Sequence, residues 1–163
     1  MSLIDPLLVL QEFDTKIADL GRKIATLPKH RAIKEAELSD TLRRQLQAEQ
    51  GLAPESAEAA APVDFDSAIA GIRAEIAEVD ERLAAAKTEL EEQKARRAEC
   101  AAGISPQHLR FYERLAISHH PTIVKLEGNI CSGCHLAQPP SSAHLIKHDT
   151  EFVTCGMCGR ILY

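Results

Sequence analysis

The sequence predicts a mainly α protein, in which a long antiparallel coiled-coil helical hairpin is followed by a small cysteine-rich β module at the C-terminus. Three observations lead to this prediction. Ala, Glu, Leu, Arg and Lys dominate the N-terminal two thirds of the chain, which is the composition of long helices. Two segments each carry a single apolar stripe with a helical period. Two closely spaced pairs of cysteines follow near the end of the chain.

The first apolar stripe predicts a long N-terminal helix. Its members are spaced alternately by three and four residues, as in a helix that packs along one face against another helix: Leu10, Phe13, Ile17, Leu20, Ile24 and Leu27. Arg31 and Lys34 interrupt the stripe, and we expect it to resume with a small shift at Leu38, Leu42 and Leu46. Pro28 predicts a kink or a local break, because its ring displaces the carbonyl four residues back.

The second stripe predicts a partner helix for the first. Residues 51–64 contain Gly51, Pro54 and Pro62 and no stripe, so we interpret them as the connection. Asp66 or Ser67 is the expected N-cap of the helix that follows. Neither helix can bury its stripe alone, and the partner in the same chain has the higher effective concentration. An antiparallel hairpin over residues 1–102 is therefore expected, with pairing between two chains as the alternative. The second stripe consists of Ile69, Ile72, Ile76, Val79, Leu83, Ala86 and Leu90.

A shorter connecting helix is predicted over residues 103–120. Gly103 suits the end of the preceding helix, and Ser105 and Pro106 suit the cap and first position of the next. We expect its buried face to consist of Leu109, Tyr112, Leu115 and Ala116. Residues 121–163 form the last predicted domain, with small strands at roughly 122–126, 151–155 and 160–163. One or two helical turns are expected between Ser142 and His148.

The four paired cysteines predict one structural zinc ion, held in a zinc ribbon. Cys131-x-x-Cys134 is separated by twenty residues from Cys155-x-x-Cys158. Zinc favours tetrahedral thiolate coordination, and each Cys-x-x-Cys turn brings two sulfurs to one edge of that tetrahedron. Glycines beside these cysteines are expected to let the backbone curl around the metal: Gly133, Gly156 and Gly159.

Three other readings of the cysteine pattern stay open. A rubredoxin-like iron site uses the same ligands. A thioredoxin-like redox pair needs a βαβ context that this sequence does not show. A catalytic zinc ion needs an open coordination position, whereas four cysteines close the shell; His135, beside Cys134, is the residue that could replace a ligand. The sequence shows no membrane span and no pattern of a signal peptide, so a cytoplasmic location is expected. In that reducing compartment paired cysteines favour metal binding over disulfides. Cys100 is left over.

Other polar residues are interpreted as solvated surface. His119 and His120 suit the negative end of a helix dipole, and His144 and His148 lie four apart as on any short polar helix. The basic residues in the helices are expected to face solvent, with a phosphate-binding role as the alternative: Arg43, Arg44, Lys94, Arg96 and Arg97.

Several stretches resemble the bacterial four-cysteine zinc-ribbon family that carries an N-terminal coiled-coil hairpin and is described as predicted nucleic-acid-binding. The resemblance covers both ends of the chain: Leu7-Leu8-x-Leu10-Gln11-x-x-Asp14-x-x-Ile17, Leu27-Pro28, Tyr112-Glu113-Arg114-Leu115 and the ending from Cys155 to Tyr163. It implies a helical hairpin with a ribbon and no known catalysis, and some relatives act as adaptors connected with sigma-54 or flagellar gene expression. This chain departs from the family in its shorter hairpin and in Ser118-His119-His120-Pro121.

Charge decides between two expected functions. The net charge is −5, and residues 121–163 carry only Lys125, Lys147 and Arg160 against three acids. Few cations allow few phosphate contacts, so we expect a non-catalytic adaptor that binds a protein partner, with nucleic-acid binding as the alternative. The apolar edge expected to meet the partner consists of Ile130, Leu136, Ile146, Ile161 and Leu162. No membrane segment, small-molecule substrate or enzymatic constellation is predicted, and the oligomeric state stays open.

Overall fold

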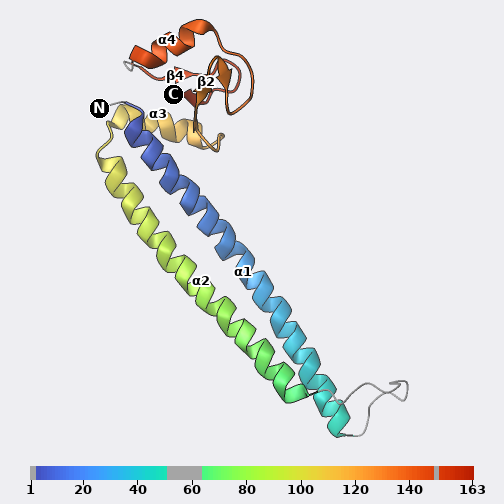
Figure 1. The fold of residues 1–163 in the computed structure, drawn as a ribbon. Coiled ribbons are helices and arrows are strands. Elements are labelled where there is room, and N and C mark those ends of the chain that lie inside the picture. The colour runs from blue at the N-terminus through green and yellow to red at the C-terminus, as the bar shows by residue number, and fades with distance from the viewer. Residues whose placement is uncertain (1–2, 51–63, 149–150) are drawn as a thin grey trace. The chain divides into compact units, whose positions relative to one another are not determined.

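The computed structural model describes residues 3–50, 64–148 and 151–163. Two long helices, α1 (Asp5–Glu49) and α2 (Phe65–Ala102), pack against each other and confirm the predicted helical pair (Figure 1). They are followed by α3 (Pro106–Ala116) and by the ribbon, which contains α4 (Pro140–His148) and five two-residue strands. Except for Asp64, the predicted connection at 51–64 lies outside the described residues.

The chain divides into two compact units, which we describe separately. One consists of residues 20–90, and the other of residues 1–19 together with 91–163. The division of the chain at residues 102 and 120 stays a prediction.

In the unit of residues 20–90, ion pairs between the helices show an antiparallel arrangement. Arg31 donates to Asp80 at 2.8 Å, and Lys34 lies 2.6 Å from Glu75. The pKa of Lys34 is raised by its hydrogen bonds to Glu75 and Glu37. Both cations therefore occupy positions in the packing stripe, where long side chains can cover apolar surface and still reach acids on the partner helix.

The stripe of α1 does not shift after these cations, so the expected return at Leu42 and Leu46 is wrong. Both leucines are exposed, at 40% and 53%. The spacing of three and four continues unchanged instead, and Thr41 and Gln45 are the partly buried residues there. The whole stripe predicted for α2 is buried or partly buried, as expected.

Two predictions about helix boundaries are also corrected. Helix α1 runs from Asp5 to Glu49 through Pro28, so the predicted local break is wrong; packing along the 45-residue helix outweighs the cost of the proline. The N-cap of α2 is Asp64, rather than Asp66 or Ser67. Its Oδ1 accepts the backbone N–H of Ser67 at 3.1 Å, as expected for a cap three residues before that donor.

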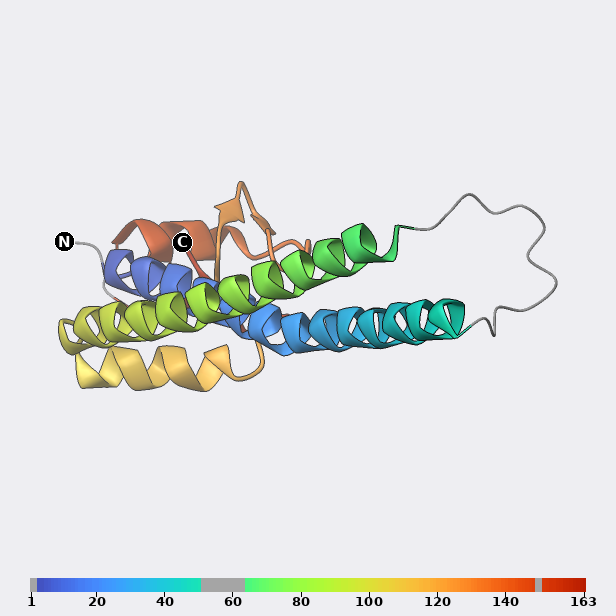
Figure 2. The ribbon, with the colours of Figure 1, turned by 90° about the horizontal axis from the view of Figure 1, so that it is seen from below.

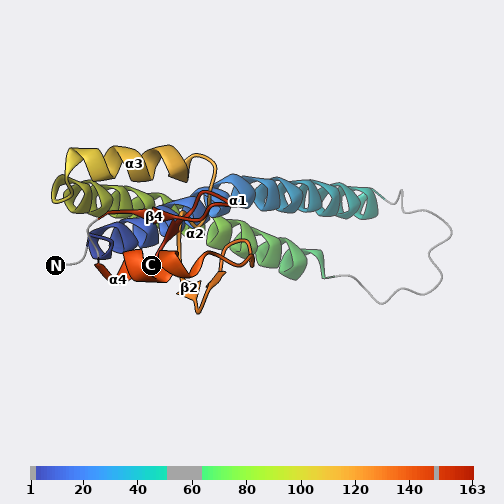
Figure 3. The ribbon, with the colours of Figure 1, turned by 90° about the horizontal axis from the view of Figure 1, so that it is seen from above.

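The other unit is built around the first turns of α1. They lie between the ribbon on one side and the end of α2 with α3 on the other (Figures 2 and 3). One continuous apolar core joins α1, α3 and the ribbon: Ile4, Leu7, Leu10, Ile104, Tyr112, Ile123 and Ile161. Ser105 caps α3 and Pro106 begins it, as predicted, and the expected face of α3 packs on this core.

Inside the ribbon, a three-stranded sheet has the order β1-β5-β4. Strand β5 (Ile161–Leu162) lies in the middle, parallel to β1 (Ile123–Val124) and antiparallel to β4 (Val153–Thr154). The hairpin of β2 (Leu126–Glu127) and β3 (Ile130–Cys131) turns at Gly128, which has a φ of 63°. The three predicted strands are present, but Leu126 belongs to this separate hairpin.

A single α1 side chain binds the free edge of β1. Strand β1 bonds to β5 through the carbonyls of Thr122 and Val124, which accept the N–H groups of Ile161 and Tyr163. The backbone N–H and carbonyl of Ile123, which lies between Thr122 and Val124, point away from β5. Its N–H donates to Gln11 Oε1 at 2.6 Å, and its carbonyl accepts from Gln11 Nε2 at 3.0 Å. The amide of Gln11 therefore supplies both bonds that a neighbouring strand would make.

An ion-pair network joins α1, α2 and α3. The carboxylate of Asp14 accepts hydrogen bonds from the Arg97 guanidinium and, at 2.9 Å, from the Tyr112 hydroxyl. Burial and the neighbouring Asp14 raise the pKa of Tyr112, so this hydroxyl keeps its proton. Glu113 lies 3.6 Å from the same guanidinium. Arg97 is thus a partly buried structural residue, and its interpretation as a solvated cation is wrong.

Candidate metal centre

The two Cys-x-x-Cys segments fold into turns with the same hydrogen-bond pattern. In each turn the carbonyl of the first cysteine accepts an N–H four residues later, from His135 and from Gly159, both at 2.8 Å. The N–H of each first cysteine in turn donates to a carbonyl five residues on, that of Leu136 or Arg160. The residue after each second cysteine has a positive φ, 59° at His135 and 75° at Gly159.

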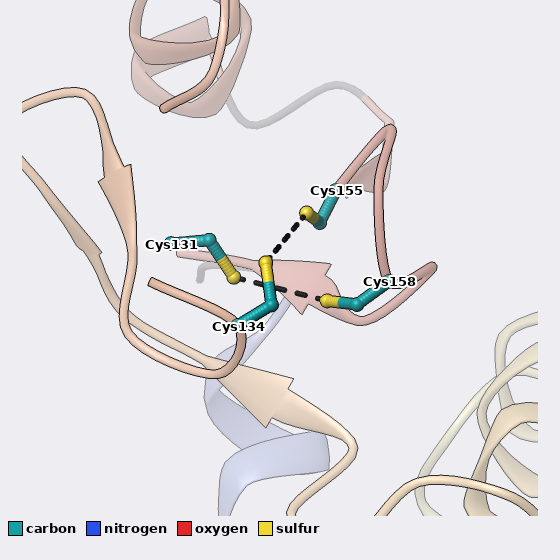
Figure 4. A group of neighbouring side chains, drawn as sticks. All are labelled: Cys131, Cys134, Cys155 and Cys158. Atoms are coloured by element: carbon teal, nitrogen blue, oxygen red, sulfur yellow. Dashed lines mark hydrogen bonds between the residues drawn. The ribbon is translucent and has the colours of Figure 1, made fainter. Parts of the chain in front are cut away.

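These two turns bring the four sulfurs into one cluster (Figure 4). The Sγ atoms of Cys131 and Cys158 are 3.9 Å apart, and those of Cys134 and Cys155 are 3.7 Å apart. All four lie within 4.8 Å of one another. A tetrahedron with Zn–S bonds of about 2.3 Å has edges of about 3.8 Å, so the cluster fits a zinc ion. Cys131 and Cys155 are buried, and the other two are partly exposed.

The ionisation of the cluster also favours a bound dication. Burial acts to raise the pKa of Cys158, but hydrogen bonds from the backbone and side chain of Arg160 lower it to about 6. At Cys134 the Leu136 N–H acts to lower the pKa, whereas burial and the neighbouring sulfurs raise it to about 12. Four thiolates this close repel one another, and a bound dication removes that repulsion.

The glycines near the cysteines have different roles from those expected. Only Gly159 has the left-handed backbone that favours glycine; in the first turn His135 takes that conformation. Gly133 is needed for space, because a Cβ there would lie 2.8 Å from Cδ of Arg160. Gly156 contributes its N–H, which donates to the side chain of Gln138.

Replacing His135 with glycine is expected to stabilise the ribbon. A non-glycine residue in the left-handed region costs about 1–2 kcal/mol, part of which is offset by the greater freedom of glycine in the unfolded chain. We expect a gain of about 0.5–1 kcal/mol in chemical denaturation of the zinc-bound protein. Ser132→Gly is the matched control, because Ser132 lies in the same turn without a positive φ. This substitution should destabilise the ribbon instead. Equal effects of the two changes would contradict this reading of the turn.

Gln138 joins the two turns and was missed by the sequence analysis. Its side chain is buried, accepts the Gly156 N–H at 3.1 Å and donates to the carbonyl of Ala137 at 3.1 Å. Arg160 makes a second connection: its Nε donates to the carbonyl of Pro121 at 2.9 Å and one terminal nitrogen to Gly133 at 3.4 Å. A lone Gln outside the Cys pattern carries no sequence signal of such a role.

Gln138→Ala is expected to destabilise the ribbon by about 1–2 kcal/mol, because it leaves the Gly156 N–H without its partner. Zinc transfer to a competing chelator should also become faster, since the two turns lose a direct connection. Gln107→Ala on the exposed surface of α3 is the control and should change neither quantity. Indistinguishable chelator kinetics for the two variants would show that Gln138 does not hold the turns together.

The fold and the site together define a zinc-ribbon protein with a helical hairpin. Residues 130–162 match the family model of the C4-type zinc ribbon domain, so the chain carries a domain of this family, which binds one structural zinc ion. No curated protein sequence matches the chain.

Among solved structures, the chain is similar to CT398 from Chlamydia trachomatis, with 19% identity, a TM-score of 0.40 and coverage of 99% of this chain and 91% of that one. It is also similar to the HP0958 protein from Helicobacter pylori, with 19% identity, a TM-score of 0.39 and coverage of 99% and 84%. A protein from Mycobacterium smegmatis gives 20% identity, a TM-score of 0.34 and coverage of 98% and 78%.

The remaining polar residues singled out in the sequence do not join the cysteine cluster. Cys100 lies in α2, where its thiol is 3.7 Å from the carbonyl of Pro6. The imidazole Nε2 of His119 lies 3.6 Å from the position that a Cβ at Gly159 would take. None of the described helices is long and apolar enough to cross a membrane.

Proposed function

We propose that this chain is a cytoplasmic, non-catalytic adaptor, that Cys131, Cys134, Cys155 and Cys158 are its zinc ligands, and that it binds a protein partner in bacterial gene regulation. Four thiolates leave a zinc ion no open position for a substrate or a reactive water, which supports a structural role for the metal. A zinc–thiolate site with all cysteines free of disulfides suits a reducing compartment.

The use of Arg160 inside the ribbon is the observation that carries the preference for a protein partner. This guanidinium donates to the Pro121 and Gly133 carbonyls, so it is held against the ribbon and only part of its five N–H donors is left for phosphate. Lys125 and Lys147 are the exposed cations of the ribbon among the described residues, whereas Arg160 is partly buried. Two phosphate contacts give weak nucleic-acid binding at physiological salt.

The ribbon offers apolar side chains to a partner instead. Ile130, Leu136 and Met157 are exposed, at 49%, 46% and 68%. The edge expected from the sequence is only partly right: Ile161 and Leu162 are fully buried in the sheet, and Ile146 packs against the second core cluster. Exposed large apolar groups beside a rigid metal site are the kind of surface that protein interfaces use.

Affinity capture from the source cytoplasm tests the proposal. We expect the zinc-loaded protein to retain a specific protein that a variant with Ile130→Glu and Met157→Glu does not retain. Ile33→Glu, on an exposed apolar residue of α1, is the control and should retain it. A parallel titration with RNA and DNA at two salt concentrations checks the alternative: tight, steeply salt-dependent binding would overturn the protein-partner proposal.

A further inference from the structure

We propose that a groove along α3 is a docking site for an acidic segment of the partner protein, one that carries an apolar side chain between two carboxylates. This inference rests on the proposed function and adds the chemistry of the partner. The groove has a volume of about 780 Å³ and lies between α3 and the residues that precede β4. The groove is lined, among others, by Arg110, Phe111, Arg114 and Phe152.

An aromatic stack forms the apolar part of the groove. The rings of Phe111 and Phe152 are nearly parallel, with centroids 5.4 Å apart and an angle of 7° between them. His108 meets Phe152 edge-on at 4.9 Å. Both phenylalanines are partly buried and pack against the core that joins α1, α3 and the ribbon. The stack is therefore held by the fold and does not need to form when a partner binds.

Two arginines give the groove its charge. Arg114 lies over the ring of Phe111 at 5.3 Å, and Arg110 stands one helical turn earlier on α3. Within the described part of the chain neither forms an ion pair, whereas Glu113 on the same helix is near Arg97. Among the residues of the lining that the structure describes, Glu151 is the single acid. The groove thus carries a local positive excess in a chain whose net charge is −5.

This arrangement selects the spacing of the partner's charges. Residues four apart on a helix are separated by about 6 Å along its axis. Two carboxylates about 6–7 Å apart, as at alternate positions of an extended segment, can each meet one arginine. Successive side chains of an extended segment point to opposite faces, so the apolar side chain between the two carboxylates would face Phe152, on the side of the groove opposite α3. Guanidinium–carboxylate pairs of this kind are charge-assisted and can be bidentate, which favours carboxylates of defined position.

The same contacts argue against a nucleic acid in this groove. A base-stacking platform needs an aromatic face that is free to receive a base. Phe111 already has a guanidinium over its ring and a second ring stacked on it. Two arginines also neutralise only a short stretch of phosphates. An acidic peptide is therefore the occupant that both the charges and the aromatic contacts favour.

Fluorescence anisotropy with short labelled peptides tests the groove directly. The probe is a peptide of alternating Glu and Leu, compared with the same peptide carrying Gln or Lys in place of Glu, and with single-stranded oligo-dT and oligo-U. We expect the full-length zinc-loaded protein to bind the Glu peptide in preference to all others. Binding of an oligonucleotide in preference to the Glu peptide, or no binding of the Glu peptide, would overturn the proposal.

Charge-reversal variants locate the binding. Arg110→Glu with Arg114→Glu should weaken binding of the Glu peptide at least about tenfold, since two charge-assisted bonds are lost. Lys125→Glu with Lys147→Glu makes the same change in net charge outside the groove and should leave the affinity within about twofold. If the first variant does not fold, Arg110→Gln with Arg114→Gln should give the same loss. Unchanged affinity in a folded groove variant rejects this site, and the capture experiment with the ribbon variants judges the proposed function independently.

Discussion

Replacing Cys155 with serine is expected to abolish stoichiometric zinc binding and unfold the ribbon while the hairpin stays helical. Cys155 is 2% exposed, and its sulfur lies 3.7 Å from that of Cys134. Apparent binding energies of structural zinc are about 10–16 kcal/mol, and in small domains this energy is largely the folding energy. The apolar cluster of the ribbon, with five buried residues, is too small to replace it.

Three measurements on this variant separate the ribbon from the helices. Elemental analysis should find no stoichiometric zinc, far-UV circular dichroism should keep most of its helical signal, and backbone amides of β4 and β5 should lose their protection from hydrogen exchange. Cys100→Ser, which removes the cysteine outside the cluster, should keep zinc and protection. A Cys155→Ser protein with a full equivalent of zinc and protected strands would contradict the four-thiolate assignment.

The second large effect is expected at Asp14. Asp14→Ala removes the acceptor shared by Arg97 and Tyr112 and leaves a guanidinium that is only 27% exposed beside a buried hydroxyl. We expect a loss of about 2–3 kcal/mol in the free energy of unfolding, between the values for exposed and fully buried ion pairs. Urea denaturation measures the change. The network joins three helices, so hydrogen exchange should also increase in α3.

Asp40→Ala is the matched control for this change. Asp40 forms an ion pair with Arg44 on the same helix at 2.9 Å, and the pair is exposed. Its removal should cost less than about 0.5 kcal/mol. Equal destabilisation by the two substitutions would show that the Asp14 network contributes no more than a surface ion pair. A double substitution with Arg97→Met should cost less than the sum of the single changes, because both report the same interaction.

The main features of the fold and the metal could be predicted because they rest on local patterns. Apolar spacing identified α2 and the first half of α1, and the cysteine spacing identified the ribbon and its zinc. The predicted course of the α1 stripe was wrong where polar residues occupy packing positions that apolar residues fill elsewhere. Arg31 and Lys34 looked like interruptions of the stripe, yet they lie in it and pair with acids on α2. Only the partner helix reveals this.

The sequence also did not predict the roles of residues whose partners are distant in the chain. Gln11 and Asp14 stood in a stretch that resembles a known family, but no spacing in the sequence connects Gln11 with Ile123 or Asp14 with Arg97 and Tyr112. Arg160 counted as a surface cation until its contacts with Pro121 and Gly133 were visible. Spacing finds residues that share one turn or one helix face, and it does not find bonds between segments about a hundred residues apart.

The pair of hydrogen bonds from the Gln11 side chain to the Ile123 backbone has a consequence for any attempt to produce the ribbon alone. An open strand edge with an unpaired N–H and carbonyl is a template for self-association. A fragment that begins after α3 would expose that edge together with the faces of Ile123 and Ile161 that α1 covers. Such a fragment, even with its metal, should form dimers or larger aggregates. In the full chain, the N-terminal helix prevents this self-association by covering the strand edge.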